Sequence, residues 1–188
     1  RFSLGDYRQA MEPAGVALDL FQSLNYPNSV ARAHQLLGDC CLELGEYPDA
    51  MRHYVAARDL FRSEKQMVHE ASCIGSIGRC LLDQGNIREA EQSMQQAIDI
   101  ASRARHPMIE NLVRINMGAS LLGRGESFRA IRELEQAATN MRRIGFPKGI
   151  ADALRNLARA YETVGDTRAA DAGFSEAMQI YRESRDEI

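Results

Sequence analysis

Five glycines recur at one fixed spacing, and this spacing constrains the fold more than any other feature of the chain. They begin the related segments GDYRQAM, GEYPDAM, GNIREAE, GESFRAI and GDTRAAD at Gly5, Gly45, Gly85, Gly125 and Gly165. A strict period of this length is the signature of a repeat protein, in which each unit packs on its neighbours. The 188 residues therefore predict one elongated array rather than several globular domains.

The composition is that of a folded protein without a strong electrostatic bias. Hydrophobic residues make up 45% and charged residues 26%, which argues against disorder. The net charge of -3 argues against direct binding of nucleic acid, which needs a basic surface. No apolar run is long enough to span a bilayer, so we expect no contact with a membrane. No secretory signal begins the chain, and because Arg1 is not a native start we expect further sequence upstream.

Each repeat carries two alanine columns that place a helix in its second half. Within a repeat the two alanines are two helical turns apart, so they share one helical face on which another helix can approach closely. The first column is Ala10, Ala50, Ala90, Ala130 and Ala170, and the second is Ala17, Ala57, Ala97, Ala137 and Ala177. Between them lies a column of varying size, Ala14, Tyr54, Met94, Leu134 and Phe174.

An equally periodic helix precedes this one and carries the small column Gly38, Gly78, Gly118 and Ala158. The glycine that opens each heptapeptide should end this first helix in a left-handed conformation. The polar residue that follows, Asp6, Glu46, Asn86, Glu126 or Asp166, should cap or charge the next helix. We predict helices near 28–44 and 47–64, repeated with the period of the glycines. Pro13 should kink or delay the first of the second helices.

These columns resemble the tetratricopeptide repeat over essentially the whole chain. The resemblance lies in the Gly/Ala position of the first helix, the glycine of the turn and the two alanines of the second helix. The usual repeat has about 34 residues. The 40-residue period of this chain therefore resembles the long-repeat subclass of kinesin light chains and many bacterial regulators. The resemblance implies an all-α fold, a right-handed superhelical α-solenoid of antiparallel helix pairs. It divides residues 1–188 into a partial repeat at 1–27, the end of a helix A plus a helix B, and full repeats at 28–66, 67–106, 107–146 and 147–188.

The resemblance also implies a concave groove lined by the first helices, called A helices, in which a peptide binds. An amide can donate and accept hydrogen bonds with a peptide backbone, and arginines can fork onto carboxylates. Apolar positions between them suit hydrophobic anchors. The alternative is that the polar residues only solvate the surface and that the apolar ones belong to the core. The candidate groove residues are Asn116, Asn156, Arg155, Arg159, Arg79, Leu112 and Ile115.

Three functions remain open on the sequence. The first is a non-enzymatic scaffold that binds a peptide or helix of a partner protein. The second is a regulatory or dimerising segment of a larger bacterial signalling protein, of the transcription-activator or diguanylate-cyclase type. The third is self-association as a homo-oligomer through uncapped ends, for which the candidate residues are Ala14, Leu18, Phe21, Phe174, Met178 and Tyr181.

No residue pattern supports catalysis, a metal or a cofactor. The histidines His34, His53, His69 and His106 fall in different columns, so they form no catalytic constellation. The cysteines Cys40, Cys41, Cys73 and Cys80 lack the spacing of a disulfide framework or a metal site, and they fill columns held elsewhere by small residues. We therefore expect small buried hydrophobes and a cytoplasmic, reducing setting.

Overall fold

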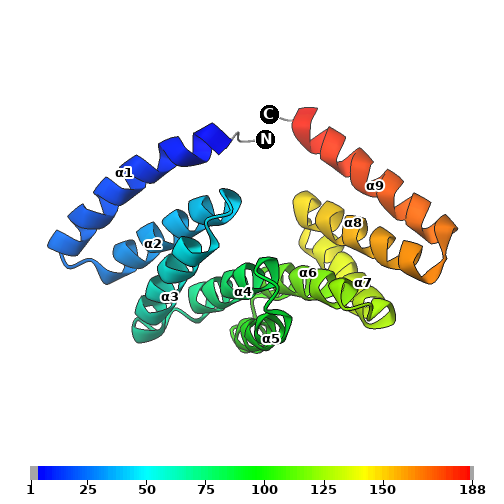
Figure 1. The fold of residues 1–188 in the computed structure, drawn as a ribbon, viewed down its shortest axis with the longest axis horizontal. Coiled ribbons are helices and arrows are strands. Elements are labelled where there is room, and N and C mark those ends of the chain that lie inside the picture. The colour runs from blue at the N-terminus through cyan, green and yellow to red at the C-terminus, as the bar shows by residue number, and fades with distance from the viewer. Residues whose placement is uncertain (1–3, 187–188) are drawn as a thin grey trace. The chain divides into compact units, whose positions relative to one another are not determined.

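The computed structural model describes residues 4–186, with side chains from 5 to 184, and this part of the chain is entirely helical (Figure 1). The chain divides into two compact units between Ala104 and Arg105. The first holds α1 (Leu4–Ser23), α2 (Pro27–Glu43), α3 (Tyr47–Ser63), α4 (Met67–Asp83) and α5 (Ile87–Arg103). The second holds α6 (Pro107–Gly123), α7 (Ser127–Ile144), α8 (Pro147–Val164) and α9 (Thr167–Asp186). Within residues 4–186, every helix falls short of the length or the apolar character needed to cross a bilayer.

The helices end at left-handed residues that recur at one regular spacing, half that of the sequence repeat. At the glycine turns, the amide of Glu46 donates to the carbonyl of Cys41 at 2.8 Å and the amide of Gly45 donates to that of Leu42 at 3.1 Å. This pair of bonds is the Schellman arrangement, which satisfies the last carbonyls of a helix. The predicted role of the turn glycines is thus confirmed for Gly45, Gly85, Gly125 and Gly165, and the predicted helix bounds differ only marginally from those observed. The residues with positive φ are Asn25, Gly45, Lys65, Gly85, Arg105, Gly125, Gly145 and Gly165.

The start of the chain differs from the sequence-based expectation. Gly5 and Asp6 lie inside α1, so they neither end nor cap a helix there, and the expected end of a preceding helix falls on residues 1–3, outside the described part. Pro13 does not delay α1, which begins at Leu4 and runs through it. Pro13 is exposed, and the backbone carbonyl that loses its partner is that of the exposed Gln9, where water can replace the lost hydrogen bond.

The expected side-chain caps form only in part. The amide of Ala169 donates to Oδ1 of Asp166 at 3.0 Å, as a cap requires. Glu46, Asn86 and Glu126 precede their helices without a side-chain cap, so capping by them was a wrong expectation. The backbone amides of all four residues, Asp166 included, close the preceding Schellman turn, and this turn sets the helix start in each repeat whether or not a side chain caps it.

The small column of each A helix exists because a large side chain of the next helix lies on it. A Cβ added at Gly38 would stand 2.9 Å from the ring of Tyr54, and one at Gly78 would stand 2.8 Å from Cγ of Met94. Both large side chains are fully buried. The two helices of each pair therefore approach closely because the glycine has no side chain there.

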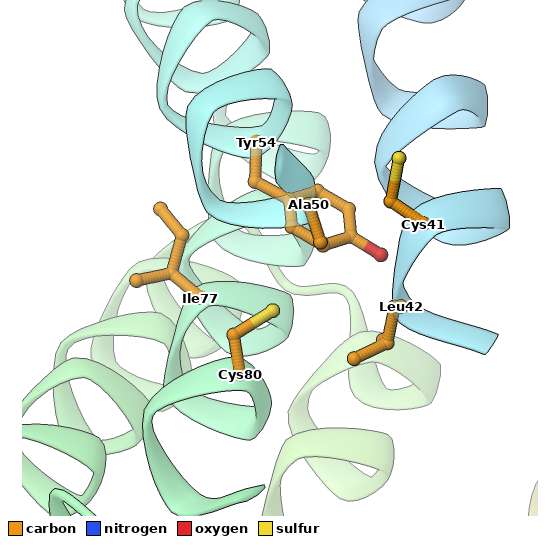
Figure 2. Close-up of a cluster of buried hydrophobic side chains, with 6 residues drawn as sticks. All are labelled: Cys41, Leu42, Ala50, Tyr54, Ile77 and Cys80. Atoms are coloured by element: carbon orange, nitrogen blue, oxygen red, sulfur yellow. The ribbon is translucent and has the colours of Figure 1, made fainter. Parts of the chain in front are cut away.

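The core of the first unit continues from one helix pair to the next. Figure 2 shows Tyr54 of α3 between residues of α2 and α4, in a cluster formed by Cys41, Leu42, Ala50, Tyr54, Ile77 and Cys80. All four cysteines are free thiols and buried, which confirms their expected role as small core residues. Burial raises the pKa of the Cys41 thiol to about 11, so it stays protonated at neutral pH.

Candidate functional site

Helices α6 and α8 are the A helices of the second unit, and they contact each other. Leu112 and Asn116 of α6 are half-buried, whereas Arg155 and Arg159 of α8 are exposed. The two arginines are one helical turn apart, about 6 Å along the helix axis. We call the surface formed by Leu112, Asn116, Asp152, Arg155 and Arg159 the α6/α8 face.

Asp152 organises the charge on the α8 side of this face. The hydroxyl of Tyr181 in α9 donates to its carboxylate, and a guanidinium nitrogen of Arg155 lies 3.8 Å from the same oxygen. Burial and this hydrogen bond raise the pKa of Tyr181 to about 12, so the phenol remains a donor. Arg159 makes no ion pair with any residue in the described part of the chain. Among the residues that the structure describes, the α8 side of the face therefore presents one loosely paired and one unpaired cation to solvent.

The two asparagines of the predicted amide column have different environments. Asn156 is only 6% exposed, and its Nδ2 donates to the backbone carbonyl of Asp152 at 3.0 Å. Asn116 is half-buried and makes no side-chain hydrogen bond with the residues that the structure describes. Ile115, one residue earlier, is buried in the core. Asn116 is therefore the amide available to a ligand, while Asn156 and Ile115 contribute to packing.

Arg79 lies on α4 in the first unit, whereas the other candidate groove residues belong to the second unit. Its guanidinium is 3.5 Å from a carboxylate oxygen of Glu43 and 3.9 Å from one of Asp83. All three side chains are substantially exposed, so these ion pairs are weak and leave the arginine accessible.

A pair of asparagines that the sequence analysis did not identify connects α6 to α7. Asn111 is almost completely buried, and its Nδ2 donates to the carbonyl of Pro107 at 2.7 Å. Its side-chain oxygen accepts a hydrogen bond from Nδ2 of Asn140 at 3.1 Å. The only sign of this pair in the sequence is Asn140 itself, which interrupts a column of Leu and Ile.

Two histidines that looked scattered in the sequence meet between α2 and α3. The Nδ1 atoms of His34 and His53 are 3.0 Å apart, and the ring centroids are 5.3 Å apart with an interplanar angle of 41°. Burial and the neighbouring His53 lower the pKa of His34, and burial and Arg52 lower the pKa of His53. The pair is therefore neutral at pH 7, with one Nδ1–H donating to the other ring.

The same pair of repeat positions is in contact in a later repeat. Arg114 and Glu133 occupy the positions of the two histidines two repeats further along the chain, and they form an ion pair of 2.7 Å. Both pairs are separated by 19 residues along the chain. This shared spacing is the sequence signal by which the histidine contact could have been found.

The residues expected to mediate self-association differ in how far they are exposed. In α1, Ala14 is buried and Leu18 and Phe21 are half-buried, whereas the exposed apolar side chains in and just after this helix are Val16, Leu20 and Leu24. In α9, Met178 is 53% exposed, and Phe174 and Tyr181 are half-buried. Phe174 and Met178 also line an open surface hollow with Asp171, Ser175, Gln179 and Arg182.

A family model described as tetratricopeptide repeat matches residues 29–103 and 109–183. No curated protein matches the sequence.

Several solved structures are similar in fold. BtubC (BKLC) from P. vanneervenii is 19% identical, with a TM-score of 0.77 over 96% of this chain and 75% of BtubC. The Rap conjugation gene regulator of plasmid pLS20, in complex with the Phr* peptide, is 18% identical, with a TM-score of 0.87 over 97% of this chain and 50% of the regulator. A Rap protein complexed with competence and sporulation factor is 12% identical, with a TM-score of 0.72 over 98% of this chain and 61% of that protein. The chain thus spans only part of each of these proteins.

Proposed function

The chain belongs to the tetratricopeptide repeat family, and we propose that it is a non-enzymatic interaction scaffold that binds a short peptide or helix of a partner protein. The observation that carries this proposal is the α6/α8 face, where an amide and an arginine without partners among the described residues lie on neighbouring A helices. The Rap regulator of pLS20, which has the same fold over this length, is in complex with a peptide, and this supports the proposal.

The chemistry of the face indicates the kind of peptide. Arg155 and Arg159 would bind carboxylates through charge-assisted hydrogen bonds. The amide of Asn116 would pair with a backbone N–H and C=O of the ligand. Leu112 offers an apolar contact beside it. We therefore propose that the ligand is a short acidic peptide with at least one hydrophobic anchor.

The test is selection of binding peptides from a random displayed library, followed by fluorescence anisotropy on the selected sequences. We expect acidic peptides, with affinity reduced about tenfold or more by Arg155→Ala/Arg159→Ala, because each charge-assisted hydrogen bond contributes about 1.5–3 kcal/mol. The matched control is Arg132→Ala/Arg143→Ala, which removes two exposed arginines of α7 with the same change in charge.

Two results would contradict the proposal. One is a selection that yields no peptide with saturable binding. The other is equal loss of affinity in the α8 and α7 double variants, which would show that net charge alone attracts the peptides. Asn116→Ala separates the contributions further, since it changes no charge and should still weaken binding.

A second candidate function, self-association through α9, is favoured by the packing of equivalent residues elsewhere in the chain. In α7, the positions equivalent to Phe174, Met178 and Tyr181 are fully or almost fully buried. In α9, this same face is half-buried or exposed, so it offers apolar area to a second molecule. Light scattering should show a monomer for Phe174→Glu and an unchanged oligomer for Phe128→Glu, whose phenylalanine is 75% exposed on α7. A monomeric wild-type protein would exclude this function.

We also propose that the chain belongs to the long-repeat subclass and acts as a regulatory segment of a larger bacterial protein. The regular spacing of the left-handed residues supports membership of the long-repeat subclass, because both helices of each repeat are then of equal length. The fold likeness to half of the pLS20 regulator supports the regulatory role. Fusion of the chain to its genomic neighbouring domain, with peptide added or withheld, would test whether that domain's activity responds.

A further inference from the structure

We propose that the self-association through α9 suggested above, on which this inference rests, is an antiparallel pairing of two copies about a two-fold axis beside Glu176 and Ala177. The residues that line the open hollow on α9 recur every three or four positions, so they form one face of this helix. We call this surface the α9 face. Its residues are Asp171, Phe174, Ser175, Met178, Gln179 and Arg182.

The repeat geometry directs this face at a neighbouring helix. In α3, Arg62 stands at the position of Arg182, and its guanidinium forms an ion pair of 2.8 Å with Glu70 of the following helix, α4. In α5, Ile98 stands at the position of Met178 and is almost completely buried. Met178 itself is 53% exposed. The α9 face therefore has the character of a helix-packing surface but remains accessible to a second molecule.

The charges at the two ends of the α9 face are complementary to each other. Asp171 and Arg182 are eleven residues apart, close to three helical turns, so both lie on the middle line of the face. They are about 16 Å apart along the axis and cannot meet within one copy. Neither makes an ion pair with a residue that the structure describes. In an antiparallel pair, Asp171 of each copy lies opposite Arg182 of the second copy, which gives two ion pairs.

The residues between the two charges are complementary as well. Phe174 and Met178 lie on one side of the middle line, whereas Ser175 and Gln179 lie on the other. In the antiparallel pair, Phe174 of each copy meets Met178 of the other, and such sulfur–aromatic contacts are favourable. Ser175 meets Gln179 across the pair, where a hydroxyl and an amide can exchange a hydrogen bond. Each contact occurs twice, as a two-fold interface requires.

Other arrangements of two copies lack this complementarity. A parallel pair would place Asp171 opposite Asp171 and Arg182 opposite Arg182, so like charges would repel. A contact of the α9 face with the exposed Val16 and Leu20 of another copy would be head-to-tail and would continue into open chains. The antiparallel pair closes as a dimer. Because each copy contributes a single helix, the interface is small and we expect a reversible dimer.

The test is sedimentation equilibrium of the full chain and of two charge-reversed variants. Asp171→Arg sets arginines opposite each other and Arg182→Asp sets aspartates opposite each other, so each should weaken dimerisation by about tenfold or more. An equimolar mixture of the two variants should recover the wild-type affinity, because each arginine again meets an aspartate in the mixed dimer. The matched control is Arg132→Asp, which makes the same change at an exposed arginine of α7 and should dimerise like the wild type.

The outcomes separate the pairing from self-association itself. A monomeric wild type at the highest attainable concentration would refute self-association, and the pairing with it. A wild-type dimer that both charge variants retain at full affinity would refute only the antiparallel pairing, as would variants that stay weakened when mixed. Equal weakening by Arg132→Asp, or growth beyond a dimer with concentration, would refute the pairing too. Circular dichroism checks that the variants are folded, which we expect because Asp171 and Arg182 are exposed.

Discussion

The substitution Gly118→Ala tests how the A and B helices of a repeat meet. A Cβ at this position of α6 would stand 2.5 Å from Cγ and 2.6 Å from Cδ2 of Leu134 in α7. Carbon atoms in contact prefer about 3.5–4.0 Å. Leu134 is fully buried, so its branched end has no open space into which it can rotate. We therefore predict that the added methyl group forces the two helices apart.

Two opposing effects set the magnitude. Overpacking of a buried site costs about 1–3 kcal/mol. Replacement of glycine by alanine inside a helix stabilises by about 1 kcal/mol. The net expectation is a loss of up to about 2 kcal/mol for Gly118→Ala. Gly78→Ala should cost less than Gly118→Ala, because the added Cβ would stand 2.8 Å from Cγ of Met94 and 3.2 Å from the carbonyl oxygen of Ala90, farther than the 2.5 Å at Gly118.

Urea unfolding followed by circular dichroism measures both variants, provided that the slope of the transition is unchanged. The decisive comparison is the effect of Gly118→Ala in a Leu134→Ala background. There the obstructing side chain is gone, so the same substitution should now stabilise by about 1 kcal/mol. Stabilisation by Gly118→Ala in the wild-type background, or an equal effect in both backgrounds, would refute the proposed clash.

The remaining predictions concern turns, a buried amide and the thiols. Gly45→Ala should destabilise by about 1–2 kcal/mol because its φ is +77°, whereas Lys65→Gly, at a φ of +57°, should stabilise. Equal signs in urea unfolding would contradict this. Asn111→Leu should cost about 1–3 kcal/mol because Asn140 loses its acceptor; an unchanged unfolding midpoint would count against it. The Cys41 thiol has a pKa of about 11 when folded and about 8.5 when unfolded, so stability should fall as pH rises through this window. A melting temperature that rises from pH 8 to pH 10 would show the opposite sign.

The helices could be predicted from sequence because their signals are local and repeated. The turn glycines, such as Gly45 and Gly85, mark helix ends through a single backbone conformation that glycine adopts without strain. The turns between repeats carry Asn25, Lys65, Arg105 and Gly145 in the same conformation, so no single residue type marks it there. The left-handed conformation of these turns could therefore not be predicted from a glycine column, although the helix ends beside them could.

The candidate site was less predictable because exposure depends on the neighbouring helix. Ile115 and Arg155 occupy equivalent positions in successive repeats, yet the first is buried and the second is exposed. Asn116 and Asn156 differ in burial as well. A column fixes the direction of a side chain from its own helix, but it does not fix what stands opposite. Single columns therefore could not separate groove residues from core residues.

Pairs of columns carry the information that single columns lack. Because every repeat has the same geometry, a contact across one helix pair predicts which positions meet in all the others. Arg114 and Glu133 are oppositely charged, so sequence analysis can recognise them as an ion pair. The same spacing of 19 residues, applied at the equivalent positions of the earlier repeat, predicts the contact between His34 and His53. In a repeat protein, two unusual residues at positions known to be in contact therefore say more about local interactions than one unusual residue in a single column.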